Sequence, residues 1–243
     1  MLISSLENNH IKKIIKLKEK KYQSESEEYL AEGYHLVEEA LKENLVTEIF
    51  VLEGISYPST VLVTTVSLKV MKKLATTTSC PDIIALVKKR KEENIGNNVI
   101  ILESIQDPGN LGTIIRTSKA FNVDTIILGG SSVDLYNSKV VRSAQGMICH
   151  SNILIRNDLP KVINSLKQKD YLVLGTKVQG GVDIRNVTFK GKIAIIIGNE
   201  GSGMSEEVSN LCDEHLYIKM HKDCESLNAA VAGAILMYEV FNK

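Results

Sequence analysis

The sequence predicts an α/β protein in which a small N-terminal domain precedes a larger domain built on a mostly parallel sheet. Two observations support this prediction. Beyond residue 98, short runs of branched aliphatic residues alternate with segments of helical periodicity, a pattern typical of parallel strands buried on both faces and covered by helices. Before them, the charged and then Asn/Gly-rich residues 88–98 lack periodicity and are predicted to link two domains, 1–94 and 95–243.

The first domain is predicted to be a small α/β unit. Ile11, Ile14 and Ile15 recur at helical spacing among lysines, which predicts a basic amphipathic helix. A second helix is expected over residues 34–45, followed by strands over 48–52 and 60–64, a helix over 68–74 and a closing strand over 82–87.

The second domain is predicted to alternate strands and helices. Strands are expected over residues 99–102, 125–128, 171–174, 193–197 and 215–218, and helices over 110–121, 159–168, 205–211 and 227–241. Asn110, Ser205 and Ser226 are residue types that cap helices, and each is predicted to cap the helix that follows it.

Composition excludes several classes of protein. Hydrophobic residues make up 44% and charged residues 24% of the 243 residues, as in ordinary globular proteins, and no apolar run is long enough to span a membrane. Lys plus Arg and Asp plus Glu both number 29, so a polyanion would have to bind a local basic patch. The four cysteines form no C-x-x-C pair and the five histidines show no ligand spacing, which predicts free thiols in a reducing cytoplasm and no metal site.

Three loops at predicted strand ends carry residues that packing alone does not require. In the first, residues 107–117, Pro108-Gly109 forces a turn and Arg116 follows among apolar side chains. Such an arginine usually has an anionic partner, which is either a ligand or, on the simpler interpretation, Asp107 or Asp124.

The second loop, residues 198–203, holds three glycines and Glu200. Glycines let the backbone approach a ligand closely. The loop has neither the Gly-Lys-Ser/Thr of a phosphate loop nor the order of a dinucleotide fingerprint, so the sequence gives no support to an NTPase or a nucleotide-dependent oxidoreductase. The third loop, residues 220–228, ends in Asn228 at the start of the last predicted helix.

Together the three loops resemble the motifs of the SpoU (TrmH-type) 2′-O-ribose RNA methyltransferases of the SPOUT superfamily. The matching segments are 107–117 (DPGNLGTIIRT), 195–204 (IIIGNEGSGM), and 218–220 (IKM) with 225–228 (ESLN). Residues 21–22 (KY) and 29–33 (YLAEG) resemble the start of the substrate-binding domain that often precedes this catalytic domain. The resemblance implies an L30e-like RNA-binding domain, a catalytic domain with a deep trefoil knot, S-adenosylmethionine as methyl donor and a homodimer.

The resemblance also assigns roles to residues. The implied catalytic set is Asn110, Arg116, Glu200, Ser226 and Asn228. The implied donor-binding set is Thr176, Gly198, Glu200, Gly201, Ile218, Met220, Ser226 and Leu227. Two positions depart from the family pattern: Lys219 stands where the family usually has proline, and Lys222 where it usually has glycine. A lysine forced into left-handed backbone geometry would cost about 1 kcal/mol.

Methyl transfer requires the ribose oxygen to lose its proton as it attacks the donor's methyl group. A guanidinium is a very poor base, so Arg116 is expected to grip a substrate phosphate and stabilise the developing alkoxide, with Glu200 or water receiving the proton. The candidate RNA-binding residues are Lys12, Lys13, Lys16, Lys20, Lys21, Arg116 and Arg142.

The RNA substrate is expected to be 23S ribosomal RNA, because the two-domain layout resembles the large-subunit rRNA enzymes. Three alternatives stay open: a tRNA 2′-O-methyltransferase, a catalytically silent RNA-binding protein of the same fold, and a methyltransferase that acts on a base nitrogen.

Overall fold

The computed structural model describes residues 2–187 and 189–241. The chain forms two compact units, one made of Met1–Lys91 with Leu135–His150 and the other of Glu92–Asp134 with Ser151–Lys243. No helix in these described ranges is both long and apolar enough to cross a bilayer.

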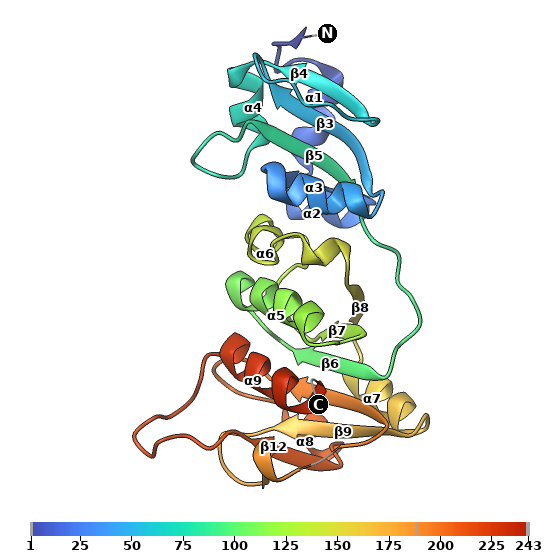
Figure 1. The fold of residues 1–243 in the computed structure, drawn as a ribbon, viewed down its shortest axis with the longest axis vertical. Helices are drawn as coiled ribbons and strands as arrows, with labels where there is room; N and C mark the ends of the chain where they lie inside the picture. Colours follow the sequence, from blue (N-terminus) through green and yellow to red (C-terminus); the bar gives the residue numbers. More distant parts are fainter. Residues whose placement is uncertain (1, 188, 242–243) are drawn as a thin grey trace. The chain divides into compact units, whose positions relative to one another are not determined.

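The first unit is a five-stranded sheet with helices packed on it (Figure 1). The strands β1 (Leu2–Ile3), β2 (Glu28–Glu32), β3 (Val46–Leu52), β4 (Leu62–Val66) and β5 (Ile83–Lys88) lie in the order β1-β4-β3-β5-β2. Strand β5 is antiparallel to both β2 and β3, whereas β3–β4 and β4–β1 are parallel. Strands β1 and β2 were not predicted.

Helices of this unit bury apolar stripes against the sheet. Helices α1 (Asn9–Lys16) and α4 (Leu68–Leu74) share a core with β3 and β5, in which Ile11, Val70 and Phe50 are fully buried. Helix α3 (Tyr34–Lys42) packs on β5, β2 and β3. The expected basic helix is in fact two helices, because α1 ends at Lys16 and α2 (Lys20–Glu25) follows after a short break. The predicted helices over 34–45 and 68–74 are confirmed, with small shifts at their ends.

Residues 135–150 contain α6 (Ser138–Ser143) and the 3-10 helix η1 (Met147–Cys149), neither of which was predicted. Helix α6 packs on β2, and η1 packs on α3. The predicted domain boundary near residue 95 stays a prediction, but the compact units place this later segment with the N-terminal residues.

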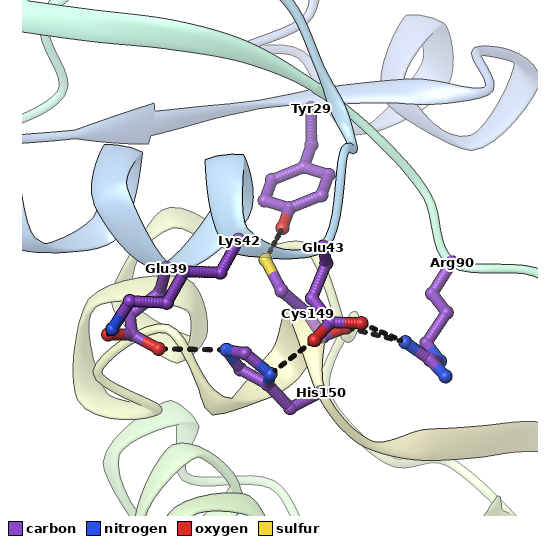
Figure 2. Close-up of polar contacts among 7 residues, drawn as sticks. All are labelled: Tyr29, Glu39, Lys42, Glu43, Arg90, Cys149 and His150. Atoms are coloured by element: carbon purple, nitrogen blue, oxygen red, sulfur yellow. Dashed lines mark hydrogen bonds and ion pairs between the residues drawn. The ribbon is translucent and has the colours of Figure 1, made fainter.

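A polar cluster holds η1 against α3 (Figure 2). The His150 ring lies between two carboxylates, with Nε2 2.8 Å from Glu39 Oε2 and Nδ1 2.8 Å from Glu43 Oε1. Only the imidazolium form offers a donor to both carboxylates. Arg90 Nη1 donates to Glu43 Oε2 at 2.9 Å and to the Cys149 carbonyl at 3.0 Å. The segment is therefore fixed by charge-assisted hydrogen bonds as well as by apolar packing.

The second unit is a seven-stranded sheet in which every pairing is parallel, which confirms the predicted mostly parallel sheet. Its order is β10-β12-β9-β11-β6-β7-β8. The strands are β6 (Asn98–Glu103), β7 (Thr125–Gly129), β8 (Asn152–Arg156), β9 (Tyr171–Thr176), β10 (Val182–Asp183), β11 (Lys192–Ile197) and β12 (Glu214–Tyr217). The two edge strands, β8 and β10, were not predicted; β10 has only two residues, Val182 and Asp183, and so carries no strand pattern.

Helices cover both faces of this sheet (Figure 1). On one face, α7 (Leu159–Lys167) and α8 (Glu206–Asn210) bury Ile163, Leu166 and Val208 against the central strands. On the other, α5 (Pro108–Ala120) packs against α9 (Ala229–Phe241). A Cβ at Gly233 would lie 3.0 Å from Ile197 Cδ1, so α9 rests closely on the end of β11. A short 3-10 helix, η2 (Ile184–Asn186), also contacts α9.

Two of the three predicted helix caps are wrong. Helix α5 begins at Pro108, so Asp107 caps it by accepting from the Asn110 N–H at 2.9 Å. Proline at the first helical position, with its fixed φ, starts the helix before Asn110. Helix α9 begins at Ala229, and Asn228 rather than Ser226 accepts from its first free N–H groups. Ser205 caps α8 as predicted.

Glu39→Gln should lower the free energy of unfolding at pH 7 by about 1–3 kcal/mol, because the amide cannot accept from both Lys42 and His150. The Lys42 hydrogen bond, aided by His150 and opposed by burial, lowers the pKa of Glu39. Its stabilising effect is therefore present above the unfolded pKa of about 4.3 and is lost as pH falls through the folded value. Thermal unfolding of both proteins from pH 7 to pH 3 measures the effect.

The matched control is Glu38→Gln, on the adjacent exposed position of α3. It should leave stability within about 0.5 kcal/mol of the parent. An equal decrease in the free energy of unfolding of the two variants would contradict the role given to Glu39.

Candidate active site

The order of the parallel strands creates a crevice between β6 and β11. From β6 the chain continues to β7 and β8 on one side, whereas β11, β9, β12 and β10 lie on the other. At such a reversal the loops that leave neighbouring carboxyl ends turn away from each other, and ligands bind in the opening. The loops after β6 and β11 are two of the three motif-bearing loops, and the third follows β12 at the same edge.

The glycine turn after β11 is closed by its own backbone. Asn199 and Gly203 exchange N–H to carbonyl hydrogen bonds of 2.9 and 3.0 Å, and Asn199 Oδ1 accepts from the Gly201 N–H at 2.9 Å. Position 198 must be glycine, because a Cβ there would lie 2.3 Å from the Gly203 carbonyl carbon. Gly203 has φ +71°, which favours glycine.

Hydrogen bonds tie this turn to the end of β6. Asn199 Nδ2 donates to the Ser104 carbonyl at 2.8 Å. Glu103 accepts from the Ser205 N–H at 3.0 Å and from the Ser205 hydroxyl at 2.7 Å. The two neighbouring strand ends are thus held at a fixed separation, which sets the width of the crevice.

Three of the predicted catalytic residues form a chain of hydrogen bonds across the crevice. Asn110 Nδ2 donates to Glu200 Oε1 at 2.9 Å, and Asn228 Nδ2 donates to Asn110 Oδ1 at 2.8 Å. Because both ends of the Asn110 amide are engaged, its orientation is fixed. Residues far apart in the sequence, at the starts of α5 and α9 and after β11, are brought together here.

Glu200 is surrounded by donors. Besides Asn110, the backbone N–H groups of Gln106 and Asp107 lie 3.3 Å from its carboxylate oxygens. Burial raises the pKa of Glu200, but the hydrogen bonds from Asn110 and these backbone groups outweigh it, and the net pKa is lowered. A carboxylate held in its charged form by donors is a weak base. Of the two proton acceptors considered from the sequence, Glu200 and water, this geometry favours water.

A pocket opens at the carboxyl ends of β9, β11 and β12, beside the first turns of α9. All eight predicted donor-binding residues line it: Thr176, Gly198, Glu200, Gly201, Ile218, Met220, Ser226 and Leu227. Sequence reasoning missed the other lining residues, which either adjoin the motifs or lie on buried elements: Lys177, Val178, Ile197, Asn199, Gly203, Leu216, Ala229, Ala232 and Leu236.

A shallower hollow adjoins this pocket and shares one wall with it. Asn110 and Asn228 line only the hollow, whereas Glu200 and Ser226 line both cavities. The structure therefore brings four of the five predicted catalytic residues to the junction of two cavities, of which the first is the more enclosed and the more apolar.

Arg116 is the exception. It follows Asn110 by six residues and so lies about 120° around the axis of α5 from it. Its side chain is exposed and lines neither cavity. Within the described ranges it makes no hydrogen bond or ion pair, so the predicted alternative of a salt bridge to Asp107 or Asp124 does not form.

The two departures from the family pattern do not strain the third loop. Lys222 is not among the residues with positive φ. The Cys224 N–H donates to the His221 carbonyl at 2.9 Å, which closes a turn around Lys222 without left-handed geometry. Lys219 lies near Asp183, whose pKa is lowered mainly by hydrogen bonds from Arg185 and also by the charge of Lys219. The penalty expected from the sequence is therefore absent.

The predicted RNA-binding residues lie in the first unit, apart from Arg116. Lys16 and Lys21 lie over the Tyr22 ring, at 5.2 and 5.9 Å from its centre, and Lys12 pairs with Glu7. Lys13 and Lys20 are exposed. Arg142 donates to the Thr76 hydroxyl at 3.0 Å.

Comparison with known proteins gives two family matches. The model of the SpoU rRNA Methylase family matches residues 97–238, and that of the MRM3-like substrate binding domain matches residues 8–85. The chain is 38% identical over 245 residues to the Bacillus subtilis 23S rRNA (guanosine(2553)-2′-O)-methyltransferase RlmP, with 98% of each chain covered.

Solved structures of methyltransferases are similar to this chain over nearly its whole length. An AdoMet-bound rRNA methyltransferase from Sinorhizobium meliloti is 27% identical, with a TM-score of 0.85 over 98% of this chain and 96% of the other. The SpoU methyltransferase AviRb from Streptomyces viridochromogenes, in complex with AdoMet, shares the fold at 21% identity, with a TM-score of 0.86 over 97% of each chain.

Gly198→Ala should destabilise the protein by about 1–3 kcal/mol, because its methyl group would collide with the backbone of residues 203–204. Gly201→Ala is the matched control in the same turn: its Cβ would meet only Asn199 Oδ1, at 3.6 Å, and its φ is not positive. Thermal or denaturant unfolding compares the two. If Gly201→Ala lowered the free energy of unfolding as much as Gly198→Ala, the steric argument would be contradicted.

Proposed function

We propose that this chain, which belongs to the SpoU rRNA methylase family, transfers a methyl group from S-adenosylmethionine to a ribose 2′-hydroxyl of ribosomal RNA. The observation that carries the proposal is the convergence of Asn110, Glu200, Ser226 and Asn228 on the junction of two cavities. Similarity over nearly the whole chain to a 23S rRNA 2′-O-methyltransferase supports the choice of substrate.

The deep pocket fits the methyl donor. Its apolar walls, formed in part by Leu216, Ile218 and Leu227, suit an adenine ring, and the glycine turn lets backbone groups approach it. The carboxylate of Glu200 supplies negative charge at the mouth of the pocket, where a sulfonium would be favoured. S-adenosylmethionine supplies a methyl group activated by its positive sulfur, so the proposal includes no metal ion. The family resemblance implies a deep trefoil knot, and we propose that this knot forms the framework of the pocket.

The polar hollow fits the ribose. Asn110 and Asn228 present amide groups there, and their mutual hydrogen bond fixes which atoms face the substrate. Holding the ribose oxygen in line with the methyl group can supply about 7–11 kcal/mol of barrier reduction. Glu200 contributes by orienting Asn110, and water takes the proton.

Arg116 acts, in this proposal, from one copy of the chain on the site of a second. It has no partner in the described part of its own chain, and it lies on α5, the helix that packs against α9. The outer face of α9 carries exposed apolar residues at helical spacing, with Val231 49% and Tyr238 52% exposed. A homodimer would bury this stripe and bring the exposed side of α5 against the second copy. Arg116 would there bind the substrate phosphate and stabilise the alkoxide.

The first unit supplies RNA affinity in this proposal. The lysines of α1 and α2 give phosphate contacts that bind RNA of any sequence.

The match to a substrate-binding domain over residues 8–85 supports ribosomal RNA over the tRNA alternative. The intact motifs and the formed pocket speak against a silent RNA-binding protein. We place the reaction in the cytoplasm, with the four cysteines as free thiols.

Incubation with S-adenosylmethionine and 23S rRNA transcripts, followed by mass spectrometry of the nucleosides, should show one 2′-O-methylated nucleoside. Arg116→Ala should lower turnover by at least about a hundredfold, because the developing charge loses its cation. The donor dissociation constant should change little, since Arg116 lines neither cavity. The control is Thr113→Ala, one turn earlier on the same exposed side of α5. A base-methylated product, or normal turnover of Arg116→Ala, would contradict the proposal.

A mixture of Arg116→Ala and Asn110→Ala chains tests whether the arginine acts across a dimer. Each variant alone should be inactive. In a dimer that pairs the two variants, one of the two sites has both an intact hollow and an intact arginine, so about half of normal activity should return. Co-expressed, differently tagged chains purified through both tags provide the sample. No recovery would show that Arg116 serves its own chain.

A further inference from the structure

Two tyrosines lie close together, partly open to solvent, in the first unit. Tyr34 begins α3 and is 41% exposed. Tyr57, in the loop after β3, is partly exposed, and the two ring centres lie 6.2 Å apart with the planes tilted by 40°. The apolar core of the unit includes neither ring, and an aromatic pair left in water is a candidate binding surface.

The topology explains why these rings meet. Strands β2 and β3 are both antiparallel to β5 and so run in the same direction, which places their carboxyl ends on the same side of the sheet. Gly33 follows β2 with φ +92°, and Gly54 follows β3 with φ +90°. A Cβ at either glycine would meet nothing within 4 Å, so the backbone beside both tyrosines borders open space.

A hydroxyl-rich loop and a cation reach the same edge. Glu32, the last residue of β2, accepts from the Thr76 N–H at 2.7 Å and from the Thr77 hydroxyl at 2.8 Å. Arg142 Nη1 donates to the Thr76 hydroxyl at 3.0 Å. Within the part of the chain that the structure describes, no carboxylate pairs with Arg142, so its charge is available to an anion.

We propose that Tyr34 and Tyr57 form a stacking platform for an unpaired base of the substrate RNA, with Arg142 binding a phosphate of the same strand. The inference rests on the proposed RNA substrate and adds to it a preference for unpaired nucleotides. Phosphate affinity alone needs only cations, such as the lysines of α1 and α2, whereas an exposed ring pair offers a surface for the π-face of a base. A cation at the same edge suits a nucleic acid better than an apolar protein segment.

The chain contains no tryptophan, so Tyr34→Trp places a single fluorophore at the platform. Titration of the full-length variant with oligouridylate should quench its emission saturably, because a stacked base contacts the indole directly. An abasic ribose-phosphate oligomer of the same length should not quench it. Leu62→Trp is the control. Leu62 is 63% exposed at the start of β4, which is parallel to β3, so it lies at the opposite end of the strands from the tyrosines. Emission from that position should stay constant.

Affinity gives an independent readout. Tyr34→Ala should weaken oligouridylate binding by about tenfold, while Tyr34→Phe should keep it, since stacking needs the ring and not the hydroxyl. Neither variant should change binding of the abasic oligomer. Unquenched Tyr34→Trp, or parental affinity in Tyr34→Ala, would overturn the platform while leaving the proposed methylation intact. A parent protein that bound no RNA at all would overturn both.

Discussion

The structure of the candidate site depends on the hydrogen bonds that tie the glycine turn after β11 to the end of β6. Asn199 reaches the Ser104 carbonyl, and Glu103 reaches back to Ser205. These contacts span the point where the strand order reverses, which is the one place in a parallel sheet where the loops diverge. Without them neighbouring loops could separate freely, and neither the pocket nor the hollow would have a fixed wall.

Glu200 illustrates how burial and hydrogen bonding decide what a carboxylate can do. Burial by itself would raise its pKa and make it a better base. Donors from Asn110 and from the backbone reverse that effect and keep the charge in place. The same contacts fix the Asn110 amide, whose other end is held by Asn228. In the proposed function, Glu200 therefore acts by orienting Asn110 and by supplying negative charge.

The first unit shows a division between two kinds of polar contact. The cluster around His150 is inward-facing: two carboxylates share one ring, and their partners Lys42 and Arg90 complete the charge balance (Figure 2). Such a cluster fixes a segment in place and leaves little for a ligand to bind. At the carboxyl ends of β2 and β3, by contrast, Tyr34 is 41% exposed and lies against Tyr57, and Arg142 donates only to the Thr76 hydroxyl among the described residues. Charged groups whose partners lie within the chain indicate a structural role, whereas a partly exposed ring pair and a cation that no described carboxylate neutralises are the features on which the proposed RNA contact rests.

The sequence by itself determined the alternating elements of the second unit, its parallel sheet and the three loops of the site, because continuous apolar runs and glycine-rich turns are local patterns. The eight residues that the resemblance assigned to donor binding all line the pocket, although nine further lining residues were not identified from the sequence. Only the tertiary structure decided which residue caps α5 and α9, that residues 135–150 join the first unit, and that Arg116 lies outside both cavities of its own chain. The physical reason is that capping, burial and distance to a pocket depend on where a helix starts and which face it turns inward. Those properties are set by contacts with residues far away along the chain.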